Sequence, residues 1–370
     1  MHDVFEVGSL IVEQAKKKLG DNLALVVYYG SQIRGDAKPD SDLDMFYVPV
    51  QETGPHLTIL FEDKCFDLYP VSWERLNERA NYDDYLTSCV HFSRVVYSRS
   101  PEDLERFQKL KDRIVELQKP EFKSHMVAKA QGIFQKASYH YFLIGLIDHG
   151  DLTATKMQAW EIVKILVHSI AVLNQTVCPG SPGASLKVIS ELPICPANLI
   201  DAAERIIHSH DPDEISSECF GLMKRLRVLL IEEHAKIQTG ATFQEVFTSA
   251  YPEIREQFVK IARACSNRDS LRAFSASVQI QHGIAIFLGR ASDGIQYTRF
   301  HHYGEFKPAY ESHKLPNLLE SIERDDFESL EEDVNELDKG IQSLLQDQSV
   351  GLNVLESIDD LDKDYWSHSR

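Results

Sequence analysis

The first hundred residues alternate between a hydrophobic pattern typical of helices and one typical of buried strands. Residues 3–19 carry apolar side chains at helical spacing, and Gly20 follows as a stop signal. Apolar runs predict four strands, at 23–29, 43–49, 65–72 and 93–98. The stretch between the second and third runs contains Gly54 and Pro55 and is expected to be a loop. We therefore expect a small sheet with helical connections.

Beyond about residue 120 the strand pattern nearly disappears. Amphipathic segments predict helices at 122–149, 153–177, 197–209, 214–237, 252–290, 315–324 and 326–346. Gly and Pro separate several of them, most clearly in the run 178–183. The predicted fold is α+β, a small mixed-sheet head followed by an all-helical body. The expected domains are 1–120, 121–236 and an acidic helical extension, 237–370.

Composition narrows the class of protein. The apolar fraction of 43% allows a sizeable core, and no run is long enough to predict a membrane span, so a cytoplasmic protein is expected. The six cysteines show no CxxC pair or regular spacing, which argues against a zinc site or a disulfide framework. The net charge of -18 argues against a nucleic-acid partner. Much of the excess of acidic over basic residues lies in residues 301–370. It is either a solvated surface or the source of a field that attracts a cationic substrate.

The stretch 28–48, YYGSQIRGDAKPDSDLDMFYV, carries the candidate chemistry. Gly30 and Ser31 end the first strand, and ten residues separate them from Asp42, which stands two positions before Asp44. Alternating strand side chains would place both carboxylates on one face, roughly 6–7 Å apart, and Leu43 on the other. Carboxylates so placed suit Mg²⁺, which prefers oxygen ligands. Gly30 lets the backbone approach a phosphate, and Ser31 can donate a hydrogen bond to it.

A third carboxylate follows on the next predicted strand. Asp67 lies between Phe66 and Leu68, where an acid is costly unless it is paired or binds a metal. In a two-metal site it would help hold the ion that activates the attacking hydroxyl, while the second ion would bind the triphosphate. Glu62 and Asp63 are rivals for this role, and an edge-strand acid facing water is the alternative for Asp67.

These motifs together resemble the nucleotidyltransferase signature of the polymerase-β superfamily. The form GSQIRGDAKPDSDLD is most similar to that of the bacterial antibiotic nucleotidyltransferases of the aminoglycoside type. The resemblance implies two Mg²⁺ ions on Asp42, Asp44 and Asp67, and transfer of a nucleoside monophosphate from ATP or another nucleoside triphosphate to a hydroxyl. It places Arg34 where many relatives have a basic residue that could contact the triphosphate. Relatives often build the active site across a dimer, so the resemblance leaves a homodimer open.

The helical body matches this resemblance less well. Relatives of the kanamycin type carry a glutamate that acts as general base, with a lysine four residues later, whereas the corresponding segment here has Gln135. His140, Asp148 and Glu161 are substitutes, although Glu161 can equally form a surface pair with a nearby lysine. Lys187 is a candidate phosphate ligand or an ordinary surface lysine. The aromatic stretch 297–310 is either a loop packed on the body or a stacking surface for a nucleobase.

We therefore expect transfer of a nucleoside monophosphate to a small acceptor, such as a cationic, aminoglycoside-like molecule. Two alternatives stay open. Related stand-alone domains resemble antitoxins that adenylylate a protein partner, but the long body here disfavours that role. The second alternative is a catalytically silent nucleotide-binding regulator, because the sequence does not identify a general base. A nucleic-acid polymerase is disfavoured by the net acidity.

Overall fold

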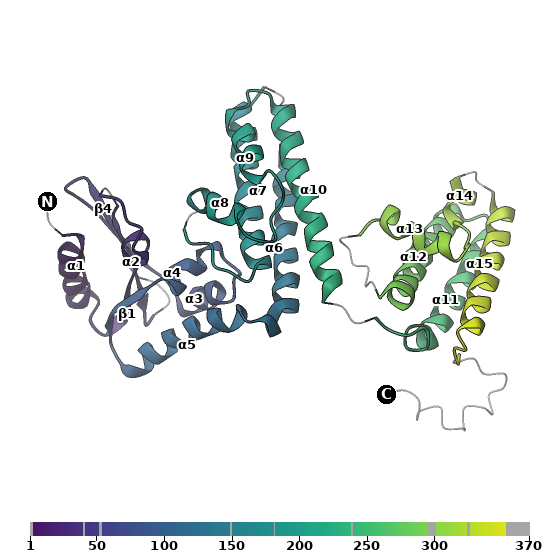
Figure 1. The fold of residues 1–370 in the computed structure, drawn as a ribbon, viewed down its shortest axis with the longest axis horizontal. Coiled ribbons are helices and arrows are strands. Elements are labelled where there is room, and N and C mark those ends of the chain that lie inside the picture. Colours follow the sequence, from purple (N-terminus) through teal and green to yellow (C-terminus); the bar gives the residue numbers. More distant parts are fainter. Residues whose placement is uncertain are drawn as a thin grey trace. The chain divides into compact units, whose positions relative to one another are not determined.

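The structure is a computed structural model that describes residues 3–39, 41–51, 54–148, 150–180, 182–237, 240–294, 301–323 and 326–352. The chain divides into two compact units, Met1–His234 and Ala235–Arg370 (Figure 1). The first unit contains a mixed sheet followed by long helices, and the described part of the second is helical. The predicted α+β class, with a sheet head and a helical body, is confirmed.

Five strands form the sheet. They are β1 Leu23–Tyr29, β2 Leu43–Pro49, β3 Leu57–Phe61, β4 Lys64–Pro70 and β5 Arg94–Ser98, in the order β3-β4-β2-β1-β5. The pairing of β2 with β4 is parallel, and the other three pairings are antiparallel. All four predicted strands are present to within one or two residues.

Strand β3 contradicts the prediction of a loop between the second and third apolar runs. It forms the edge of the sheet and hairpins onto β4 through Glu62 and Asp63, whose φ angles of 50° and 61° are both positive. Such angles characterise a tight two-residue hairpin turn. Gly54 and Pro55 suggested a loop, but the chain becomes extended directly after them, and most of β3 is exposed.

Helices cover the two faces of the sheet differently. Helix α1, Val4–Leu19, begins at the N-cap Asp3 and packs an apolar stripe against one face, which includes Leu43, Met45 and Phe66. The opposite face meets helix α5, Pro101–Leu117, whose Phe107 contacts Phe46 of β2. The short helices α2 Ser31–Arg34, α3 Trp73–Ala80 and α4 Ser88–His91 connect the strands.

The helical body of the first unit contains α6 Lys123–Ile144, α7 Leu152–Leu173, α8 Pro182–Ser190, α9 Leu199–His208 and α10 Pro212–Lys236 (Figure 1). The four helices predicted here, α6, α7, α9 and α10, are confirmed. Helix α8 was not predicted, because the Pro- and Gly-rich run 178–183 indicated a break. Pro182 is in fact its first residue, a position where the missing N–H of proline costs little.

The second unit contains α11 Phe243–Ser266, α12 Ser270–Leu288, α13 Tyr303–Ser312, α14 Leu318–Glu323 and α15 Phe327–Asp347. A single helical segment at 252–290 was wrong, because the chain turns at Arg268, with φ of 50°, and Asp269 caps a new helix. Helix α11 also starts nine residues earlier, at a capping box of Thr242 and Glu245. The two later predicted helices correspond to α14 and α15.

Residues 297–300 of the aromatic stretch lie outside the described residues, and residues 303–310 form part of helix α13 rather than a loop. There the Tyr310 hydroxyl donates to the backbone oxygen of Gln281 at 2.7 Å. The buried Tyr310 and Ala309 therefore serve the core of the second unit.

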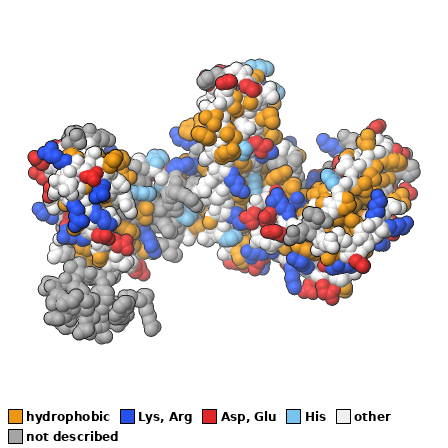
Figure 2. All heavy atoms as spheres, turned by 180° about the vertical axis from the view of Figure 1, so that it is seen from behind, with side chains coloured by type: hydrophobic (Ala, Val, Ile, Leu, Met, Phe, Trp, Pro, Cys, Tyr) orange, Lys and Arg blue, Asp and Glu red, His pale blue; other side chains and the backbone are white. Residues whose placement is uncertain are grey.

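All six cysteines are free thiols, and four of them are buried. Within the described ranges, no helix has both the length and the apolar character needed to cross a membrane. Figure 2 shows hydrophobic side chains gathered on the helical body, and the exposed ones include Tyr139 and Phe142 on α6 and Leu146 just after it.

Polar groups meet where the sheet head joins the helical body. Lys129 of α6 pairs with the exposed Asp83 at 2.6 Å, and the buried His168 of α7 is only 9% exposed. Burial lowers the pKa of His168 to about 4, with Lys136 and Lys129 acting in the same direction and Asp84 and Asp83 opposing them. His168 is therefore neutral in the folded protein at neutral pH.

This burial predicts a specific acid sensitivity. The folded pKa of His168 lies below its ordinary value of 6.5, so the unfolded chain binds a proton between pH 6.5 and 4 that the folded chain does not. We expect the wild type to lose about 2 kcal/mol more unfolding free energy than His168→Gln as the pH falls from 7 to 5. Urea unfolding at both pH values measures this difference. Equal losses in the two proteins would contradict it.

Candidate active site

Asp44 and Asp67 stand side by side on neighbouring strands. The parallel register of β2 and β4 pairs Asp44 with Asp67, and the antiparallel register of β1 and β2 pairs Asp44 with Tyr29. Residues paired in this way project from the same face of a sheet. Leu43 lies on the other face, in the cluster covered by α1, as the alternation predicted. Asp42 lies in the loop immediately before β2, half-buried.

Gly30 brings the backbone directly against Asp44. A Cβ atom added to Gly30 would overlap Asp44 Oδ2, and the residue has φ of 84°, a conformation that favours glycine. Helix α2 follows at once, with Gly30 at its N-cap position and Ser31 as its first residue. The turn at Gly30–Ser31 and the carboxylate of Asp44 are therefore adjacent.

The carboxylates repel one another. Desolvation by burial, followed by the charges of Asp42 and Asp67, raises the pKa of Asp44 to about 6, while Arg34 partly opposes the effect. Burial, assisted by the neighbouring carboxylates, therefore disfavours the charged form of Asp44. A bound cation would lower the pKa of Asp44 and remove the penalty.

Strand β3 and the residue before it supply two partners of Asp67 that were not predicted. Asp67 Oδ1 accepts a hydrogen bond from Thr58 of β3 at 2.8 Å and lies 2.5 Å from Nε2 of His56, which immediately precedes the strand. Alternating polar and apolar residues in HLTILF, followed by a polar turn, were the sequence signal for this strand.

The rivals for the third carboxylate occupy a different place. Glu62 and Asp63 form the two-residue turn that joins β3 to β4, where both residues are exposed. Asp67, in contrast, lies within β4 beside Asp44. The register therefore favours Asp67 over both rivals as the third carboxylate of this group.

Arg34 links the sheet head to the helical body. It is the last residue of α2, its side chain is 19% exposed, and it pairs with Asp36 at 3.2 Å. A Cβ atom added to Gly180 would lie 3.8 Å from Arg34 Nη2, and the Arg34 charge lowers the pKa of the nearby Cys178 thiol, which burial raises. The loop before α8 thus packs beside the guanidinium. Lys187, on α8, is exposed and has no ion pair with Asp42, Asp44 or Asp67 in the described part of the chain.

The candidates for a general base have other partners or exposed positions. His140 Nδ1 lies 2.9 Å from Gln158 Oε1, and Glu161 pairs with Lys164 at 2.6 Å. Asp148 is exposed in the connection between α6 and α7, and Gln135 is half-buried within α6. The surface-pair interpretation of Glu161 therefore matches the observed contact.

The carboxylate oxygens at this site are the type of ligand that a hard cation such as Mg²⁺ prefers. Within the described ranges, no group of three or more His, Cys, Asp or Glu side chains is close enough to form a ready-made metal site. Mg²⁺, however, usually binds through one or two carboxylates, several waters and substrate phosphates rather than an all-protein cage. Asp42, Asp44 and Asp67 could supply such carboxylate ligands.

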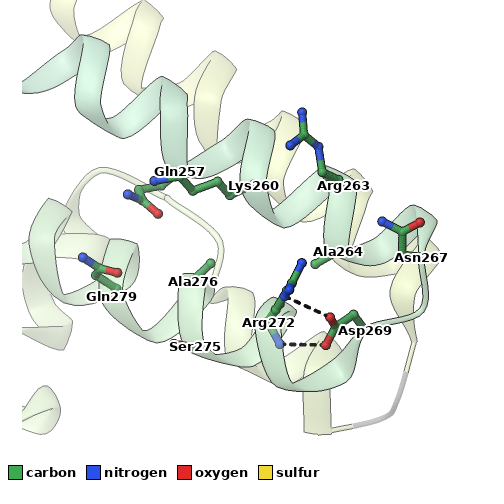
Figure 3. A pocket seen from close by; sticks show the side chains of 10 residues that line it. All are labelled: Gln257, Lys260, Arg263, Ala264, Asn267, Asp269, Arg272, Ser275, Ala276 and Gln279. Atoms are coloured by element: carbon green, nitrogen blue, oxygen red, sulfur yellow. Dashed lines mark hydrogen bonds and ion pairs between the residues drawn. The ribbon is translucent and has the colours of Figure 1, made fainter.

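Two hollows lie elsewhere on the protein and are lined by none of Asp42, Asp44 and Asp67. One, of about 360 Å³, lies between α11 and α12 above Ala264 and Ala276 (Figure 3). Its rim carries Arg263, Arg272 and Asp269, and Arg272 is hydrogen-bonded to Asp269. The other, of about 370 Å³, is a mainly apolar furrow between α1 and β3. Neither contains paired carboxylates.

Comparisons with known proteins do not identify a family for this chain. No family model and no curated protein matches this chain. Among solved structures, it is similar to a nucleotidyltransferase-like protein from Exiguobacterium sibiricum, with a TM-score of 0.30 and 10% identity. The alignment covers 64% of this chain and 84% of that one. A TM-score this low does not define a shared fold.

The contact between Gly30 and Asp44 can be tested by substitution. We expect Gly30→Ala to lose at least about 1 kcal/mol more unfolding free energy than Gly35→Ala. Gly35 has a similar φ of 88° but lies in the left-handed region, with ψ of 15°, and has nothing within 4 Å of an added Cβ. Gly30 combines a ψ of -166° with the overlap against Asp44, and both add to the cost of a side chain there. Urea unfolding measures both variants, and equal losses would contradict the close approach.

The repulsion at Asp44 predicts a stabilising substitution. The folded pKa lies above the ordinary 3.8, so the charged carboxylate destabilises the metal-free protein above pH 6, and protonation relieves this as the pH falls. Asp44→Asn should therefore melt at a higher temperature than the wild type at pH 7.5, with EDTA present, and lose most of this advantage as the pH falls from 6 to 4. Asp63→Asn, in the exposed turn, is the control. A lower melting temperature for Asp44→Asn at both pH values would refute the repulsion.

Proposed function

We propose that this protein is a Mg²⁺-dependent nucleotidyltransferase that transfers a nucleoside monophosphate, with ATP as the first donor to test, to a hydroxyl of a small acceptor. The pairing of Asp44 with Asp67 beside the Gly30–Ser31 turn carries the proposal. This arrangement brings carboxylates for a cation next to a backbone turn that can approach a phosphate. Nucleotidyl transfer needs both, because charge develops on the triphosphate as pyrophosphate leaves.

The protein's own groups have separable roles in this proposal. Asp42 and Asp44 would hold the cation that binds the triphosphate, and Asp67 would share the ion near the acceptor hydroxyl. Bound Mg²⁺ would neutralise charge on the phosphates and make the acceptor hydroxyl more acidic. The turn at Ser31 and the guanidinium of Arg34 would contact the phosphates, and His56 and Thr58 would hold Asp67 in place.

The acceptor is proposed to be small and cationic. The net charge of -18 gives the protein a negative field, which raises the local concentration of a polyamine-like or aminoglycoside-like molecule. Lys187 is retained as a candidate phosphate ligand only for a bound state in which its side chain reaches the site.

The proposal predicts metal-dependent nucleotide binding at the carboxylates. ATP at a hundredfold excess over its Kd should stabilise the wild type by about 2.7 kcal/mol with Mg²⁺ and much less with EDTA. The double variant Asp42→Asn/Asp44→Asn should lose the Mg²⁺-dependent increment, because it lacks the carboxylates that hold the ion. Asp63→Asn should retain it. Thermal unfolding with and without ligand measures the effect.

Two outcomes would change the proposal. Equal stabilisation of the wild type and the double variant would place nucleotide binding elsewhere. Binding without pyrophosphate release, across a panel of hydroxylated cationic acceptors, would favour the silent regulator instead. Release that depends on one acceptor would identify the substrate.

A further inference from the structure

Two tyrosines form a bridge directly beneath the carboxylates. Tyr29 is the last residue of β1 and immediately precedes Gly30, and Tyr69 lies two residues after Asp67 on the same face of β4. Their hydroxyl oxygens are 3.0 Å apart, and their rings meet edge to face at 6.4 Å. The bridge therefore joins the strand that carries Asp67 to the strand that leads into the Gly30–Ser31 turn.

This bridge crosses a strand rather than joining neighbours. Strands β1 and β4 flank β2 and share no backbone hydrogen bonds, so they are roughly 9–10 Å apart. The two side chains reach each other over Phe46 of β2, whose ring centroid lies 5.8 Å from that of Tyr29 and 6.3 Å from that of Tyr69. The contact between the two hydroxyl groups fixes the spacing between β1 and β4, whose backbones are connected only through β2.

A buried arginine lies near one end of the bridge. Arg79 of α3 is 4% exposed, and its charge opposes the rise that burial causes in the pKa of the Tyr69 hydroxyl. Asp84, also buried, lies 3.6 Å from Arg79 Nε and supplies an opposite charge. Burial raises the pKa of both tyrosines, so both hydroxyls stay protonated and hydrogen-bonded at neutral pH.

We propose that the Tyr29–Tyr69 bridge is a positioning element that sets the spacing between the Asp44–Asp67 carboxylates and the Gly30–Ser31 turn. The inference rests on the proposed function, because it matters only if a cation on the carboxylates must also bind phosphates at the turn. Mg²⁺ tolerates little departure from octahedral geometry, so a small lateral shift of β4 against β1 weakens its simultaneous contacts. Neither tyrosine needs to touch the substrate.

The test uses the full chain and three single substitutions, Tyr29→Phe, Tyr69→Phe and Tyr82→Phe, together with the double variant of the bridge. Tyr82 is the matched control, because its hydroxyl is buried and accepts a hydrogen bond from Gln118 at 3.2 Å in the same unit. The probe is ATP at fixed concentration with increasing Mg²⁺. The measured quantity is the Mg²⁺ concentration at half-maximal stabilisation, which a merely structural tyrosine would leave unchanged.

We expect either bridge substitution to raise this Mg²⁺ concentration about tenfold and Tyr82→Phe to leave it at the wild-type value. The double variant should resemble the single variants, because losing one hydroxyl already breaks the bridge. Wild-type values in the bridge variants, or effects that add in the double variant, would overturn the positioning role and leave the proposed function intact. A wild type with no Mg²⁺-dependent response would overturn both.

Discussion

The parallel pairing of β2 with β4 is the constraint on which the site depends. It places Asp44 beside Asp67 at one level of the sheet, and the antiparallel pairing with β1 brings the Gly30 turn against the same carboxylate. The arrangement is unfavourable for the protein alone, since burial and neighbouring charge raise the pKa of Asp44 to about 6. A carboxylate whose charged form is disfavoured, in an otherwise well-packed sheet, is typical of a functional site.

The rest of the first unit supports that unfavourable arrangement from two sides. Helix α1 packs the apolar face of the sheet, where Leu43 and Phe66 hold β2 and β4 in register. The opposite face carries Asp44 and Asp67 together with the aromatic rings of Tyr29, Phe46 and Tyr69. Holding Asp44 and Asp67 on strands fixes their mutual spacing before any ligand binds.

The sequence predicted the parts of this architecture that depend on local pattern. Long apolar runs identified β1 and β2 because both strands are buried, and the D-x-D spacing identified the face on which Asp44 lies. Strand β3 escaped prediction because it is an exposed edge strand following Gly and Pro, and His56 and Thr58 were missed with it. The pairing of Tyr29 with Tyr69 depends on strand order, which local sequence does not encode. For the same reason, no pattern in α6 or α7 identified a base.

The most direct test of this account is a crystal structure with Mn²⁺ and a non-hydrolysable ATP analogue, using anomalous scattering to locate the metal. The account predicts Mn²⁺ bound by the carboxylates of Asp42 and Asp44 and by a phosphate oxygen, with the triphosphate over the Gly30–Ser31 turn. Asp67 is expected to hold or border a second ion. Mn²⁺ and nucleotide bound away from Asp44, or a nucleotide bound at the turn without any metal, would contradict it.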